Sequence, residues 1–94
     1  MHLGVYHFNG DPAALTAGYD KLVAQFAGEL LLNICVLRDD GISVYDACPS
    51  RAEFVGFSTS EFFRDALKDA GLPDPVVEHV GDVHAVAPHP TAVG

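Results

Sequence analysis

The periodicity of apolar residues restricts this chain to a small set of folds. It predicts strand, helix, strand, strand, helix and strand, in that order, within 94 residues. A chain of this length forms one domain, which we place at residues 1–87. Residues 88–94 carry no packing signal, and we expect them to form a mobile C-terminal tail.

The first half of the chain supplies a strand at 2–8 and a helix at 12–27. Asp11 can accept the free amide hydrogens of a helix start, and Pro12 suits the first helical position. The stretch 30–38 is almost wholly apolar, which is typical of a strand that is buried on both faces.

The second half supplies a strand at 42–48, a broken helix and a last strand. Ser50 with Glu53, and Ser58 with Glu61, form two capping boxes, so we expect the helix in two pieces. We expect the two helical pieces at 51–57 and 59–70. The last strand is expected at 76–86, with a bulge at Gly81.

This order of elements is that of the ferredoxin-like α+β fold, βαββαβ. Right-handed crossovers give an antiparallel sheet in the order 4-1-3-2, with two helices on one face. Strand 30–38 then lies at an edge, where an uncovered apolar strand promotes aggregation. We therefore expect a homodimer in which two sheets pack face to face, a dimeric α+β barrel. Phe26, Ile34 and Leu67 are expected in the core between sheet and helices.

Acidic residues dominate the charge of the chain. The chain has 13 acidic and 5 basic residues. The resulting net charge of −8 argues against nucleic acid and anionic membrane surfaces as partners. No apolar run reaches the ~18 residues of a membrane span, and no signal-peptide pattern is found, so we expect a cytoplasmic protein.

Cys35 and Cys48 form no metal-ligand motif. His79, His84 and His89 recur every five residues and so alternate between strand faces; we expect no metal site.

The hairpin at 39–41 decides which polar side chains share a face of the sheet. A loop of all three residues places Ser43 and Tyr45 beside Asn33. A turn made by the last two residues alone brings Asp46 to that side instead. We favour the first register because it separates polar from apolar residues more fully.

In the favoured register, the face away from the helices collects His7, Asn33, Cys35, Ser43 and Tyr45. Polar groups that converge in an apolar cavity are the usual anatomy of a small-molecule site. His7 is the candidate general base, because imidazole titrates near neutral pH. Asn33, Tyr45 and Ser43 are candidate ligand-binding residues that would hold a substrate oxygen. The alternative for each is a structural role, since buried polar groups need partners wherever they lie.

The strand pattern, with the stretches Ser58–Leu67 and Gly71–Pro75, resembles the dimeric α+β-barrel superfamily. That superfamily includes antibiotic-biosynthesis monooxygenases, muconolactone-isomerase-like enzymes and many small bacterial members. The resemblance implies a cofactor-independent monooxygenase, or an isomerase or cyclase, acting on an aromatic or polyketide-like substrate. One alternative is a non-catalytic dimeric binding protein. Another is a haem-binding protein that uses His7 or His79.

Overall fold

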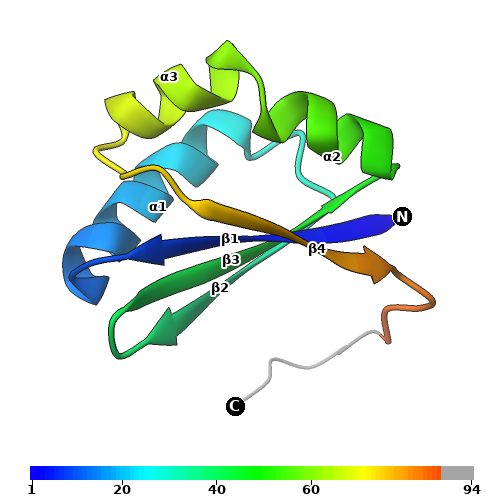
Figure 1. Ribbon diagram of the computed structural model, residues 1–94, viewed down its shortest axis with the longest axis horizontal. Helices are drawn as coiled ribbons and strands as arrows, with labels where there is room; N and C mark the ends of the chain where they lie inside the picture. Colours follow the sequence, from blue (N-terminus) through cyan, green and yellow to red (C-terminus); the bar gives the residue numbers. More distant parts are fainter. Residues whose placement is uncertain (88–94) are drawn as a thin grey trace.

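The computed structural model describes residues 1–87, which form a four-stranded antiparallel sheet with three helices on one face (Figure 1). This α+β arrangement is compatible with a ferredoxin-like fold. The expected tail, 88–94, lies outside the described residues. The elements are β1 (His2–Asn9), α1 (Pro12–Phe26), β2 (Leu32–Arg38), β3 (Gly41–Cys48), α2 (Arg51–Ser58), α3 (Glu61–Asp69) and β4 (Val76–Asp82).

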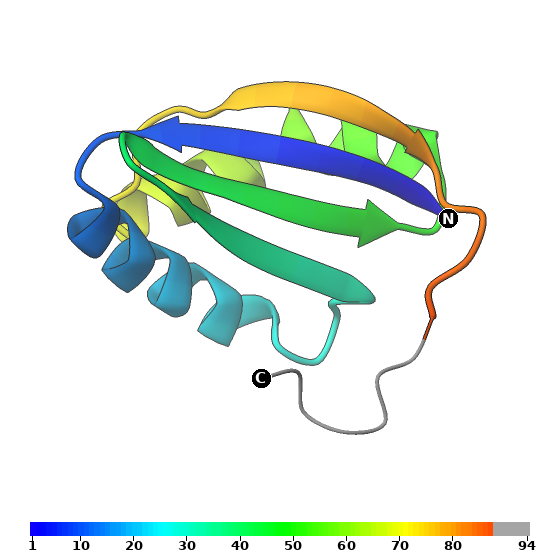
Figure 2. The same ribbon diagram turned by 90° about the horizontal axis from the view of Figure 1, so that it is seen from below.

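The strand order is β2-β3-β1-β4, which is the order 4-1-3-2 read from the other edge. β2 and β4 are therefore the edge strands. Figure 2 shows the sheet from its other side, where no helix covers it. We call this side the open face. β4 ends at Asp82, earlier than expected, and its register with β1 shifts beside Gly81, which confirms the predicted bulge.

The helices begin at side-chain caps. The Asp11 carboxylate accepts from the Ala14 amide at 3.1 Å, and the Ser50 hydroxyl accepts from the Glu53 amide at 3.2 Å. The expected break in the second helical region is confirmed, but its second cap is Ser60 and not Ser58. The Ser60 hydroxyl accepts from the Phe63 amide at 3.1 Å.

The core fills the space between the sheet and the helices. Its most deeply buried large side chains are Phe8, Ile42 and Phe54. Phe26 and Leu67 belong to it as expected, whereas Ile34 does not. Ile34 is 48% exposed and points to the open face, so the expected parity of β2 is wrong.

The register of the β2–β3 hairpin explains that error. Arg38 pairs with Gly41, and Asp39 and Asp40 form the turn, so the favoured three-residue loop is wrong. The alternative register had the correct parity, although its turn lay one residue too late. A Cβ atom on Gly41 would lie 2.0 Å from the carbonyl oxygen of Phe8. Gly41 is thus needed in β3 for close backbone approach, not in the turn for a left-handed conformation.

The edge strand β2 is exposed in the single chain. It begins at Leu32, later than expected, and the expected burial on both faces is not found. Ile34 and Val36 are exposed on the open face, and Leu37 is 66% exposed. Among residues 1–87, no helix has both the length and the apolar character needed to span a bilayer.

Candidate functional site

The sheet divides the predicted site residues between its two faces. His7, Ser43 and Tyr45 lie on the open face as expected. Asn33 pairs with Asp46 and points toward the helices, where it contacts Tyr19. The prediction that all five residues share one face is therefore wrong for Asn33, and also wrong for Cys35, which packs against the core.

On the open face, His7 and Ser43 belong to a polar row. The Nδ1 atom of His7 is 2.8 Å from the Ser43 hydroxyl oxygen, and Arg38 Nε donates to the same oxygen at 2.9 Å. His7 Nε2 lies 3.5 Å from Glu78 Oε1 on β4. Ser43 is buried, so its hydroxyl is committed to these two neighbours. The half-buried Tyr45 pairs with Ile34 on the neighbouring strand.

Two neighbouring hollows with shared lining residues lie on the opposite, helical side of the sheet. An inner cavity of about 40 Å³ lies between the three helices and the sheet. An outer cleft of about 250 Å³ opens between the end of α1, the end of β3 and the start of α2. The residues that line both are Phe26, Leu30, Asp46 and Phe57. We call the two together the helical-side cleft.

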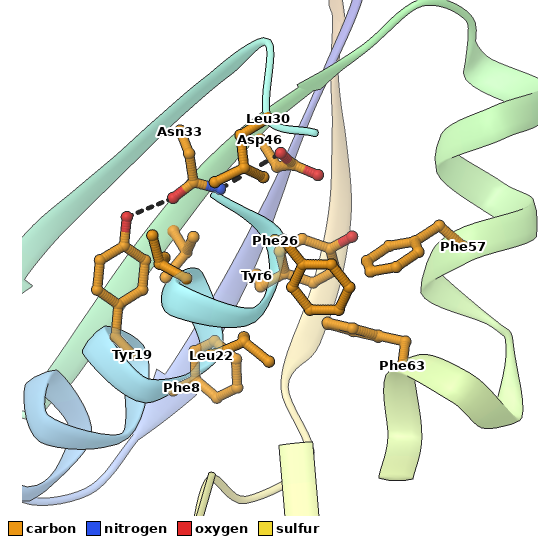
Figure 3. Close-up of a pocket in the computed structure, with 12 residues that line it drawn as sticks. Tyr6, Phe8, Tyr19, Leu22, Phe26, Leu30, Asn33, Asp46, Phe57 and Phe63 are labelled. Carbon is orange, nitrogen blue, oxygen red and sulfur yellow. Dashed lines mark hydrogen bonds between the residues drawn. The ribbon is translucent and has the colours of Figure 1, made fainter. Parts of the chain in front are cut away.

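Asp46 is the ionisable group at the junction of cavity and cleft. It is only 7% exposed. Asn33 Nδ2 donates to its Oδ1 at 3.3 Å, and the Cys48 thiol donates to its Oδ2 at 3.7 Å. The Tyr19 hydroxyl donates to Asn33 Oδ1 at 2.5 Å, which orients the amide toward Asp46 (Figure 3).

Burial sets the electrostatics of this junction. It raises the pKa of Asp46, and the hydrogen bonds from Asn33 and Cys48 offset only part of that rise. Burial, and then the charge of Asp46, raise the pKa of Cys48 to about 11. The thiol therefore stays protonated at neutral pH and is a donor rather than a nucleophile.

The Tyr6 hydroxyl is an unused polar group beside this junction. Tyr6 is 3% exposed and lines the inner cavity, yet its hydroxyl has no hydrogen-bond partner in the described residues. Burial chiefly, and then the charge of Asp46, raise its pKa, so the phenol is neutral. In Figure 3 its oxygen lies beside the Phe26 and Phe57 rings, on the side toward Asp46.

Aromatic rings form the walls of the helical-side cleft. Phe26 meets Phe57 edge-on at 5.6 Å between centroids, and Phe57 lies 4.8 Å from Phe63. Phe63 lies 5.0 Å from Tyr6. Edge-on and tilted arrangements are the geometries that aromatic pairs prefer.

The sequence analysis named Asn33 as a candidate, on the opposite face, but did not name Asp46 or Tyr6 as site residues. The alternative hairpin register was the signal for Asp46, because it placed this carboxyl beside Asn33. Tyr6 directly precedes His7 on β1, so its side chain points to the opposite, helical face and into the core.

The histidines are distributed over separate places. The buried His2 contacts His79 at 2.9 Å between Nε2 and Nδ1, and His7 is held by Ser43 and Glu78. His89 lies outside the described residues. Within 1–87, no group of three or more histidine, cysteine or acidic side chains is placed to hold a metal ion.

Comparison with known proteins adds no relative. No family model matches this chain, and no curated protein or solved structure matches it.

Proposed function

We propose that this protein binds a small molecule with a flat apolar group in the helical-side cleft, with Asp46 as the polar anchor. The observation that carries the proposal is the position of Asp46, a buried carboxyl where the open cleft meets the aromatic cavity. Small-molecule sites usually have mostly apolar walls with a small number of polar groups.

The environment of Asp46 lowers the stability of the folded chain. A buried carboxylate is expensive unless a cation or several donors satisfy it. Within residues 1–87 Asp46 takes part in no ion pair, and its two donors are a neutral amide and a thiol. A ligand that adds a donor would offset this cost, which supports a binding role over a purely structural one.

Blocking the cleft tests this proposal. Leu30→Trp should fill the junction, since Leu30 lines both hollows, while Val55→Trp adds the same ring on the exposed side of α2. We expect a thermal-shift screen of phenols, aromatic amines and aromatic acids to give hits with the wild type and Val55→Trp that vanish with Leu30→Trp. Hits that persist in Leu30→Trp would contradict the proposal.

Proton transfer is a second candidate function, of the cofactor-independent isomerase or cyclase type. It is favoured by the raised pKa of Asp46, because a carboxyl that ionises closer to neutral pH can both accept and return a proton. Asp46 would remove a proton from carbon next to a carbonyl and return it to the enolate. Deuterium uptake from D₂O into phenylacetone, lost in Asp46→Asn, would support this function; equal uptake in both would contradict it. The monooxygenase alternative rests on the resemblance alone.

We also propose that a second copy of the chain covers the open face. Ile34, Val36 and Val76 expose apolar surface there, at the two edges of the sheet. Arg38 lies on one edge strand and Glu78 on the other. A two-fold axis along the strands would place the β2 edge of each copy over the β4 edge of its partner, bringing these opposite charges together. Light scattering should give twice the 10.0 kDa chain mass.

A further inference from the structure

The geometry points to an organic cation, a protonated amine attached to a flat apolar group, as the ligand of the helical-side cleft. This inference rests on the proposed function, that the cleft binds a small molecule, and adds the charge of that molecule. It departs from the aromatic or polyketide-like substrates implied by the resemblance, because phenolate and carboxylate ligands would meet charge of their own sign.

The charges that line the cleft have one sign. Glu29 and Glu53 line the outer cleft, and Asp46 lies at its inner end. Among the described residues that line either hollow, none is lysine, arginine or histidine. Glu53 also lies 3.4 Å from the Ser50 hydroxyl at the start of α2, whereas Asp46 has neutral donors only. In a protein of net charge −8, this arrangement attracts cations and repels anions.

The unpartnered Tyr6 hydroxyl is a second, independent observation that points to a polar ligand group in this cleft. Buried polar groups are almost always paired, and an unpaired one requires an explanation. This hydroxyl is buried, and Tyr6 and Asp46 both line the inner cavity, on the same face of β1 and β3 and two positions apart in register. An ammonium group at the junction can donate to both oxygens at once, because it carries three hydrogens.

The aromatic walls suit the same ligand. Phe26 and Phe57 line both hollows, so they flank the point where the ammonium group would lie. Aromatic faces attract cations, and the attraction is larger at a site shielded from water. The apolar part of the ligand would lie against these rings in the outer cleft, since the 40 Å³ inner cavity has room only for a small group.

Three probes of nearly equal shape and different charge test the inference. They are 2-phenylethylamine, a cation at pH 7, 2-phenylethanol, which is neutral, and 3-phenylpropanoate, an anion. Calorimetry at low ionic strength on the wild-type protein should show the amine binding at least about ten-fold more tightly than the alcohol, because its hydrogen bond to Asp46 is charge-assisted. The anion should bind most weakly.

The outcomes separate the two proposals. Equal binding of the three probes, or tighter binding of the alcohol or the anion, would overturn the cation inference and leave the cleft as a small-molecule site. No binding of any probe would overturn both. Because this comparison uses the wild type only, it does not depend on a variant that folds.

Asp46→Asn then assigns the preference to one side chain. We expect the amine to lose about ten-fold in affinity while the alcohol changes less than about two-fold. Asp65→Asn is the matched control, since it removes one negative charge from an exposed position of α3 outside the cleft. An amine preference that survives in Asp46→Asn, or that falls equally in Asp65→Asn, would overturn the assignment.

Discussion

At the scale of single residues, the site depends on where Asp46 points. Its carboxyl is buried with an amide and a thiol as partners, and desolvation raises its pKa. Groups with displaced pKa values in a cleft often mark functional sites. The same displacement has a consequence for stability that can be measured without a ligand.

Asp46→Asn should change how stability depends on pH. The pKa of Asp46 lies above its unfolded value of about 3.9, so the folded state binds the proton more tightly. The stability gained from this is fully present below the unfolded pKa and is lost as pH rises through the folded one. Denaturant unfolding, measured from below the unfolded pKa to above the folded pKa, should show the wild type losing stability relative to Asp46→Asn as pH rises. A relative gain by wild type with rising pH would contradict the account.

Gly41 shows why the register could not be predicted from residue types. A glycine after two aspartates suggests a left-handed turn position. Here the role of Gly41 depends on the close approach of the Phe8 carbonyl on β1, which lies 33 residues away in the sequence. That contact exists only once the sheet has formed, and the error it caused placed Asn33 and Cys35 on the wrong face.

Gly41→Ala should therefore be costly. The added Cβ atom would meet backbone that cannot move without breaking the β1–β3 pairing. We expect a loss of roughly 2–3 kcal/mol in the free energy of unfolding, measured by urea denaturation. Gly28→Ala is the control, because nothing lies within 4 Å of a Cβ atom there, and its effect should stay within about 0.5 kcal/mol. Equal effects of the two substitutions would contradict the register.

At the scale of elements, most of the fold could be predicted and the parity of β2 could not. Helix starts at Asp11 and Ser50 follow from local capping chemistry, which the sequence displays directly. β2 is apolar on both faces, so its own pattern does not distinguish them. Only its partner strand orients it, through the Arg38–Gly41 pair.

Ile34→Lys should reveal what covers the open face. Ile34 is exposed on β2 in the single chain, so a lysine there costs little in an isolated monomer. If a second copy packs on this face, the buried charge should dissociate it, and the mass from light scattering should fall by about half. Val55→Lys, on the exposed side of α2, should leave the mass unchanged. A wild-type protein that is already monomeric at micromolar concentration would contradict the dimer.

At the scale of the whole molecule, we propose different roles for the two faces of the sheet. The helical face holds the acidic cleft with its aromatic walls, and the open face holds the apolar edges and the polar row around Ser43. The sequence displayed both sets of residues, but it could not assign Asn33 and Asp46 to the first set without the strand register. Because the proposed ligand site and the proposed dimer surface lie on opposite faces, we expect substitutions on one face to leave the other unchanged.

The location of a bound ligand tests the central claim most directly. We expect titration of ¹⁵N-labelled protein with 2-phenylethylamine to shift amide resonances around the helical-side cleft, with Phe26, Leu30, Asp46 and Cys48 among the most affected. Residues of the open face such as Ser43 should change little. Shifts centred on Ser43 and its neighbours, with the cleft unchanged, would contradict the account.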